Sequence, residues 1–433
     1  MRRWFVALGG ALLMACLGTV YAWSVFTQPL QAAFGWSSAE TTLAFSLAIF
    51  FLGVGAVAGG RWQDRAGPRR VALAGALLWA AANLLAGLGT ARLGAPWLYA
   101  TYGVLGGLGL GLGYVTPVAA VTKWFPDRRG MGGGVVVMGF GLGAFLYAHL
   151  VRALPAFARA SAEAARVLSE RAAGRPAAAP GVADAVLATF TGTGLALAVL
   201  GAAGAALMRN PPATPAALAR PGGGVELPPS RMVRTPQFWA AWSMLFLNVF
   251  AGILFISNAV PIMRELTGAA PAAAAATYGT IALANALGRL AWGSLSDRIG
   301  RRAALTLIYL LQVAVFLAVG HVHLLWAVAL LFAVVLACYG GGFGVMPPLV
   351  ADWFGTRHLG ANYGYVLLAW GAAGLAGPGF VAWVKDHRGG YAAALPVTAG
   401  LLAVATLLPL ASRPPGAGRS SPSGAEEARG QHH

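Results

Sequence analysis

Two polar side chains stand one helical turn apart in an otherwise apolar segment, residues 271–294: Asn285 and Arg289. Residues four positions apart share one face of a helix, so the amide and the guanidinium are expected to lie together. A guanidinium keeps its charge in proteins, and a cation in the middle of a bilayer costs about 2.5–3.5 kcal/mol on insertion scales. Its planar fork of donors fits the two oxygens of a carboxylate. The pair therefore predicts an anion-binding site.

The alternative is a structural arginine that is neutralised by a buried acid. The chain has 13 Asp and Glu residues, and none of them falls in the middle of an apolar segment. Because an unpaired buried charge is expensive, we favour an exogenous anion as the partner of Arg289.

The composition is that of a membrane protein. Of 433 residues, 58% are hydrophobic and 10% are charged, and the mean hydropathy is +0.68; a water-soluble domain has about 25% charged residues. Apolar stretches of about 20 residues predict an all-α membrane protein with twelve transmembrane helices. The spans are 4–26, 41–60, 71–90, 97–121, 131–152, 186–208, 238–262, 273–294, 303–320, 324–350, 361–384 and 391–411. We interpret the first as an uncleaved helix rather than a signal peptide.

The net charge of +17 is explained by where the basic residues lie. Most of the 30 Lys and Arg residues fall in the ends and loops on one side of the predicted spans. Basic loops stay in the cytoplasm, so we expect both termini there, in a bacterial inner membrane. The charge then indicates contact with anionic membrane lipids and no nucleic acid.

The spans divide into two sets of six. We predict an N-terminal six-helix bundle over 1–208, a cytoplasmic linker rich in Pro and Gly over 209–237, a C-terminal six-helix bundle over 238–412 and a disordered tail over 413–433. Segment 153–184 is expected outside the membrane, and its Ala-rich first half favours a surface helix.

A G-x-x-x-D-R-x-G motif follows the second span and recurs after the eighth. Its residues are Gly60, Asp64, Arg65 and Gly67 in the first copy, and Gly293, Asp297, Arg298 and Gly300 in the second. Glycine permits close helix approach and left-handed backbone. The aspartate is expected to cap a helix start or to pair with an arginine of a neighbouring helix.

This repeated signature resembles that of the major facilitator superfamily. The resemblance covers about residues 1–412 and implies two pseudo-symmetric six-helix bundles around a central cavity that is exposed to each side of the membrane in turn. When the two motifs are aligned, Arg289 falls on Ala56. An arginine with a purely architectural role would be expected in both halves, so the asymmetry favours a substrate site.

Further segments resemble the oxalate/formate antiporter family and the related bacterial monocarboxylate (lactate) transporters. They are Tyr21-Ala22-Trp23-Ser24-Val25-Phe26, Lys123-Trp124-Phe125-Pro126-Asp127-Arg128-Arg129-Gly130, Asn285-Ala286-Leu287-Gly288-Arg289 and Asn362-Tyr363-Gly364. The resemblance implies that Arg289 binds the substrate carboxylate. We expect aromatic side chains within the spans to wall the site; they are Tyr21, Tyr114, Tyr339, Phe343 and Trp370. Taken alone, each is better explained by helix packing, except Tyr339 and Phe343, whose glycine-dense surroundings favour the site.

One position departs from the family pattern. The resemblance implies a lysine midway along span 11 in oxalate carriers, whereas this chain has Trp370 there. One fixed positive charge suits a monoanion such as lactate, pyruvate, glycolate or formate. Lys385 and Tyr391 resemble an outer gate pair of the lactate carriers.

The expected function is secondary active transport of small monocarboxylates by a monomer, without cofactor, metal or enzymatic activity. Proton symport is implied by the family alone; protonated substrate, His149 as a proton relay, and charge compensation on the arginine remain open as routes. The first alternative is an oxalate/formate-type antiporter. A drug exporter is disfavoured because no mid-span acid is present, and a non-transporting membrane receptor is the alternative from another class.

Overall fold

A computed structural model describes residues 2–212, 226–388 and 394–415, with helices and no strand among them. Before the linker the elements are α1 (Arg2–Gly18), η1 (Thr19–Ala22), α2 (Ser24–Phe34), α3 (Ser38–Ala66), α4 (Pro68–Leu98), η2 (Tyr99–Leu105), α5 (Gly106–Trp124), α6 (Arg129–Ala153), α7 (Pro155–Ala172) and α8 (Val182–Ala206). After it come α10 (Pro229–Met232), α11 (Pro236–Thr267), α12 (Pro271–Ile281), α13 (Leu283–Ile299), α14 (Arg301–Ala318), η3 (Val319–His321), α15 (Leu325–Phe354), α16 (Leu359–Arg388) and α17 (Ala394–Ala411).

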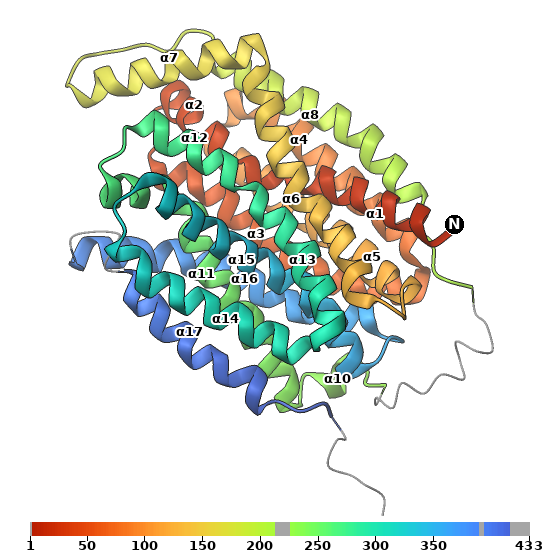
Figure 1. The fold of residues 1–433 in the computed structure, drawn as a ribbon. Coiled ribbons are helices and arrows are strands. Elements are labelled where there is room, and N and C mark those ends of the chain that lie inside the picture. Colours follow the sequence, from red (N-terminus) through yellow and green to blue (C-terminus); the bar gives the residue numbers. More distant parts are fainter. Residues whose placement is uncertain (1, 213–225, 389–393, 416–433) are drawn as a thin grey trace, which may run out of the picture.

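The all-α membrane fold is confirmed. Among the described residues, seven helical segments are long and apolar enough to cross a membrane. The helices before the linker gather on one side of the molecule and those after it on the other (Figure 1). Most of the predicted tail and part of the predicted linker lie outside the described residues, so the domain limits stay a prediction.

Two predicted spans are interrupted. The first span consists of α1, the 3-10 turn η1 and α2. The eighth span consists of α12 and α13, which are separated at Ala282. The helix break in the first span frees the carbonyl of Cys16, which accepts from Thr19 Oγ1 at 2.8 Å and from Trp79 Nε1 at 3.2 Å. Irregular backbone inside a membrane is tolerated where such partners satisfy it.

The third and fourth spans form one helical run of 57 residues, from Pro68 to Trp124. The chain nevertheless turns between them, because Gly94 has φ 68° and ψ −159°. This left-handed backbone is open to glycine at little cost, and the helix resumes through Pro96.

The aspartates of the two motifs cap helices of the opposite half. Asp64 accepts from the backbone N–H of Ala361 at 2.8 Å, at the start of α16. Asp297 accepts from Gly130 and Met131 at 2.9 and 2.8 Å, at the start of α6. An anion at a helix N-terminus is favourable because the first N–H groups lack helical partners. The two halves are therefore joined at the end of the molecule that carries the motifs.

The first glycine of each motif lies against the same capped helix. A Cβ on Gly60 would overlap the carbonyl of Gly360, and one on Gly293 would overlap the carbonyl of Gly130. The later glycines, Gly67 and Gly300, have φ of 82° and 89° and end α3 and α13. The motif thus contains one glycine for contact between halves and one for the turn.

Ion pairs reinforce this junction. Asp352 on α15 accepts from Arg129 Nη1 at 2.7 Å and from Arg301 Nε at 3.1 Å. Arg301 Nη1 also reaches Asp297 at 2.6 Å. These side chains come from α6, α13, α14 and α15, so a charged network holds the two halves together on one side of the site.

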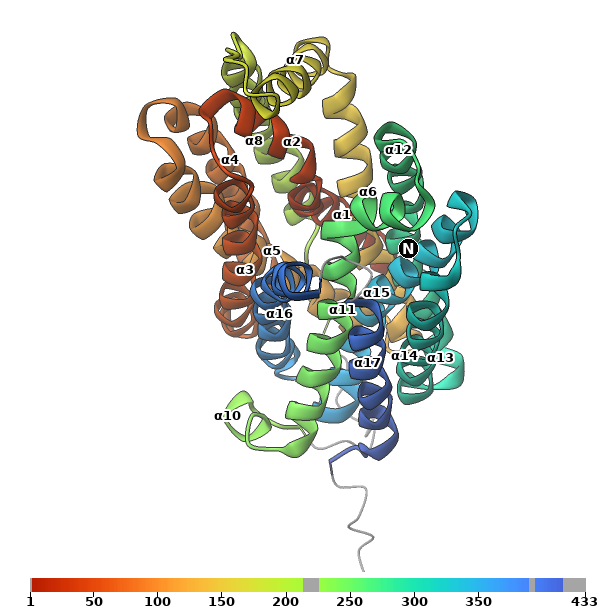
Figure 2. The same ribbon diagram turned by 90° about the vertical axis from the view of Figure 1, so that its left-hand side faces the viewer.

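Helix α7 is the predicted surface helix. It buries Phe157 and Val167, while exposed Arg166 bridges Glu163 and Glu170 at 2.6 Å each. The hydrogen bond from Arg166 lowers the pKa of the Glu163 carboxyl below its ordinary value. Helices α7, α2 and α12 lie toward one end of the molecule and α10 toward the other (Figure 2).

Candidate functional site

Arg289 lies on α13 with no exposed surface. Its Nε donates to Oδ1 of Asn285 at 3.1 Å, as the spacing of the two residues predicts. Within the described residues, Nη1 and Nη2 have no hydrogen-bond partner. Buried charged donors without acceptors are strongly unfavourable. The side chain therefore presents two free donors and a full charge inside the protein.

The carboxylates of the described ion pairs lie elsewhere. They belong to the motif end and to α7, and none of these pairs includes Arg289. The alternative of a structural arginine held by a buried acid finds no support in that part of the chain.

The glycine-rich stretch of α15 supports the backbone of α13. A Cβ on Gly340 would overlap the carbonyl of Asn285, and one on Gly344 would overlap the carbonyl of Arg289. Such close approach between helix backbones is possible only without side chains. Gly340 and Gly344 thus have a physical role: they bring the arginine-bearing helix against α15.

Two phenylalanine rings flank the guanidinium. The Cζ atom of Arg289 lies 4.8 Å from the ring centroid of Phe343 and 5.3 Å from that of Phe140. Cation–π contacts of this kind are worth about 2 kcal/mol when desolvated, so they offset part of the cost of burial. Phe140 was not predicted, because an apolar residue in the glycine-rich helix α6 carries no chemical signal in the sequence.

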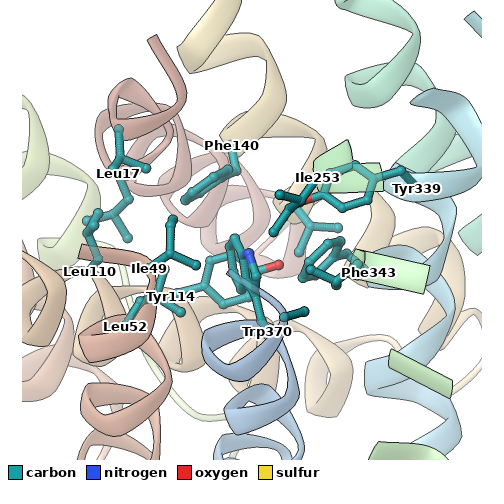
Figure 3. Packing of buried hydrophobic residues seen from close by; sticks show 14 of the residues in the cluster. Leu17, Ile49, Leu52, Leu110, Tyr114, Phe140, Ile253, Tyr339, Phe343 and Trp370 are labelled. Carbon is teal, nitrogen blue, oxygen red and sulfur yellow. The ribbon is translucent and has the colours of Figure 1, made fainter. Parts of the chain in front are cut away.

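Trp370 and Tyr114 pack around the same centre. The Trp370 ring lies 4.6 Å from Phe343 and 5.0 Å from Tyr114, between centroids. Figure 3 shows Tyr114, Phe140, Phe343 and Trp370 converging on one point from helices of both halves. Trp370 is fully buried. The predicted aromatic residues are therefore brought together.

Three more buried donors in this region have no hydrogen-bond partner among the described residues. They are Nε1 of Trp370 and the hydroxyls of Tyr114 and Tyr363. The Tyr114 hydroxyl lies near enough to Tyr363 and Arg289 to interact with both, but without the geometry of a full hydrogen bond. Tyr363 was part of the family resemblance but was not predicted as a site residue. Together with the guanidinium, the region is rich in donors, and no ion pair of the described residues brings a carboxylate to it.

Tyr21 and Tyr339 join the two halves beside the arginine. Their hydroxyl oxygens lie 2.5 Å apart, with Tyr21 in η1 and Tyr339 on α15. The Tyr21 ring also contacts Phe140 and Trp370, with centroids at 5.1 and 6.1 Å. The helix break in the first span therefore places Tyr21 in the aromatic cluster.

A cavity of about 310 Å³ leads toward this cluster from the end that carries α2, α7 and α12. Its lining includes Tyr21 and Asn285 but not Arg289. Because Asn285 contacts both the cavity and the guanidinium, the arginine lies just behind the cavity wall. The opposite end of the molecule is the one joined by the motif aspartates.

His149 lies on the wall of the cavity. Its Nδ1 is 2.8 Å from the carbonyl of Phe145, and its ring packs on that residue at 4.3 Å between centroids. It is exposed, near the end of α6, and is not among the residues around Arg289. A relay role for His149 stays a prediction.

The outer gate pair that the resemblance implies, Lys385 and Tyr391, lies outside the described side chains. The placement of Tyr391 and of the Lys385 side chain is not described. In the described part of the chain, no group of three or more His, Cys, Asp or Glu residues is arranged to hold a metal ion.

A comparison with protein-family models identifies the family of this chain. The model of the Major Facilitator Superfamily matches residues 8–350 and, in a second match, 254–431. The chain belongs to this superfamily and is a multi-pass membrane transporter rather than an enzyme. The alternative of a non-transporting receptor is not supported.

Three similar proteins are named as transporters of organic acids. The chain is 29% identical to the oxalate:formate antiporter of Oxalobacter formigenes, over 89% of this chain and 86% of that protein. It is 30% identical to apicoplast pyruvate carrier 1 of Toxoplasma gondii, over 84% and 81%. Monocarboxylate transporter 13 of Rattus norvegicus is 29% identical over 34% of each chain.

Solved structures share the fold at low identity. A proton:xylose symporter superposes with a TM-score of 0.68 at 16% identity, covering 94% of both chains. The fucose:proton symporter of Escherichia coli has a TM-score of 0.68 at 15% identity, covering 94% of this chain and 98% of that one. These matches concern the fold alone.

Proposed function

We propose that the chain is a secondary active transporter of small monocarboxylate anions. The observation that carries the proposal is the state of Arg289: it is fully buried, held by Asn285 through Nε only, with both terminal nitrogens unpaired. Two parallel N–H donors on one planar group match a carboxylate. The relatives that carry organic acids support the same substrate class.

The surroundings favour a small and singly charged substrate. Around the guanidinium the walls are aromatic, from Phe140, Phe343 and Trp370, and the free donors are neutral. A second carboxylate would be placed among rings without a second cation to balance its charge, which is costly in a dry site. The predicted set of contacts is Arg289 and Asn285 on the carboxylate, with Tyr21, Tyr114, Tyr339, Phe343 and Trp370 around the rest of the substrate.

Alternating access would begin from the conformation described here. The cavity lies at one end, while Asp64 and Asp297 join the halves at the other. We infer from the basic loops that the joined end is cytoplasmic, so the cavity would face outward. To open toward the cytoplasm, the two halves must separate at the motif aspartates and close over the cavity at the other end.

Coupling to protons would follow from charge balance. No carboxylate lines the described cavity, so the proton would travel on the substrate or through His149. In this scheme the guanidinium binds the anion and the accompanying proton makes the transported unit neutral.

A second candidate is exchange of oxalate for formate. The similarity over most of the chain to the Oxalobacter formigenes antiporter favours it, whereas Trp370 in place of a second cation disfavours a dianion.

Purified protein in liposomes distinguishes the two. Uptake of labelled lactate or pyruvate that is driven by an inward proton gradient, and abolished by a protonophore, supports the proposal. Oxalate uptake that requires internal formate and is indifferent to the protonophore supports the antiporter. Failure to move any monocarboxylate refutes the proposal.

A further inference from the structure

A second cavity adjoins the one described above. It has a volume of about 360 Å³ and lies between α2 and α7, with Gln28 and Ser161 in its wall. Three residues line both cavities: Ser24, Val25 and Arg152. The two spaces therefore meet at the last turn of α6, which carries Arg152.

Arg152 is the one permanently charged residue that lines these cavities among the described residues, and no Asp or Glu lines either. It is exposed and takes part in no ion pair of the described chain. The glutamates of neighbouring α7 are occupied by Arg166. Its charge is therefore available to an anion in the cavity.

The wall of the first cavity suits the same kind of ligand. Neutral hydroxyl groups of Ser24 and Thr42 line it, and they can donate to a carboxylate without adding charge. A cleft with one sign of charge and low-dielectric walls concentrates counter-ions and raises association rates, by tenfold or more in steered systems.

We infer that Arg152 is an anion-capture site at the mouth of the outer cavity. Arg152 binds the carboxylate of the substrate while the substrate is still exposed to solvent. The anion then passes to Asn285 and Arg289. This inference rests on the proposed function for the identity of its ligand, but the capture of anions as such can be tested without transport.

The first test measures anion accumulation directly. A Ser24→Cys substitution places a thiol on the shared wall, in a background where the buried Cys16 and Cys338 are replaced by alanine. The labelling rate by an anionic sulfonatoethyl methanethiosulfonate is divided by the rate for its cationic trimethylammonium counterpart. We expect Arg152→Gln to lower this ratio about 3–10-fold and Arg152→Lys to preserve it.

Arg159→Gln is the matched control. Arg159 is also exposed near the same end of the molecule but lines neither cavity, so its loss should leave the ratio unchanged. A ratio that is insensitive to Arg152, or one that falls equally in the Arg159 variant, would overturn the capture site.

The second test uses transport. Arg152→Gln should raise the KM for a monocarboxylate about 3–10-fold without changing the maximal rate, and the difference should shrink at high salt because exposed charges are screened. A lower maximal rate at unchanged KM would contradict capture. If the labelling ratio responds but even the native protein moves no monocarboxylate, the proposed function fails while the anion site stands.

The phosphate of a lipid headgroup is an anion that an arginine can bind in place of a carboxylate. Labelling is therefore repeated in liposomes that contain anionic lipid. If the ratio depends on Arg152 in detergent but not in these liposomes, a headgroup occupies the arginine and the capture site is refuted.

Discussion

Asn285 holds Arg289 by one edge only: Oδ1 accepts from Nε at 3.1 Å, and both terminal nitrogens remain without a partner in the described chain. The amide thus fixes the orientation of the guanidinium and leaves its bidentate edge free. Because Asn285 also lines the cavity, it connects the arginine to the route by which a substrate would reach it.

Replacing Arg289 by glutamine should abolish uptake. Glutamine keeps a hydrogen-bonding group but cannot offer a charged fork to a carboxylate, and the removal of an unpaired buried charge should not weaken the fold. Initial rates in proteoliposomes and a thermal unfolding curve check both statements. Uptake at the native rate would show that the clamp is wrong.

Two substitutions at Asn285 should have different effects. Asn285→Ala releases Arg289 and should raise the KM about tenfold, the equivalent of about 1.4 kcal/mol for a lost hydrogen bond to a charged group. Asn285→Asp supplies an internal carboxylate beside the guanidinium and should abolish transport by competing with the substrate. Equal behaviour of the two variants would argue against the orientation role.

Trp370→Lys should change the charge preference of the site. A second cation near Arg289 repels the first unless a dianion lies between them, so oxalate should raise the unfolding temperature of this variant more than it does for the native protein. Trp370→Phe, which keeps the packing but lacks a charge, is the control and should retain monocarboxylate transport. No gain in oxalate binding would mean that Trp370 does not face the substrate.

The motif aspartate of the second half should govern the conformational equilibrium. Asp297→Asn removes the charge that meets the start of α6 and Arg301, so the conformation described here should become less populated. Labelling of Ser24→Cys in the outer cavity should slow severalfold as that cavity closes more often. Asp127→Asn is a suitable control, since Asp127 pairs with Arg3 within one half.

The pH dependence of α7 follows from Glu163. Because its pKa is lowered by the hydrogen bond from Arg166, the pair contributes to stability above the ordinary carboxyl value of 4.5 and loses this contribution as the pH falls through the lowered value. Amide exchange in α7 should therefore be faster in Glu163→Gln than in the native protein at pH 7. The difference should shrink as the pH falls through the lowered pKa of Glu163, and a difference that does not shrink with acidification would exclude the ion pair as its cause.

The contact between Asn285 and Arg289 was predictable from the sequence, whereas the surroundings of the candidate site were not. The pair was singled out because a charge in an apolar span is costly and because residues four apart share one face of a helix. Phe140 and Tyr363 were missed since aromatic residues in apolar spans usually reflect packing alone. The breaks at η1 and Ala282 were also missed, because an apolar run of sufficient length predicts a continuous helix.

Contacts between the halves were only partly predictable. The motif predicted that Asp64 would cap a helix start or pair with an arginine of a neighbouring helix. In the structure Asp64 caps the start of α16 at Ala361, which is 297 positions away in the sequence. Nothing local to the motif indicates which helix it meets. That information lies in the packing of one half against the other.

The facing glycines at this junction have a consequence for the balance between conformations. At Gly60 and Gly293 an added methyl group would meet a backbone carbonyl of the opposite half, and this penalty exists only while the halves touch there. Alanine at either position should therefore destabilise the conformation in which the halves touch there and leave the opposite conformation unaffected. The populations of the two conformations would then shift through a steric effect alone. The lack of a side chain at these two positions would thus help to determine to which side of the membrane the substrate-free transporter opens.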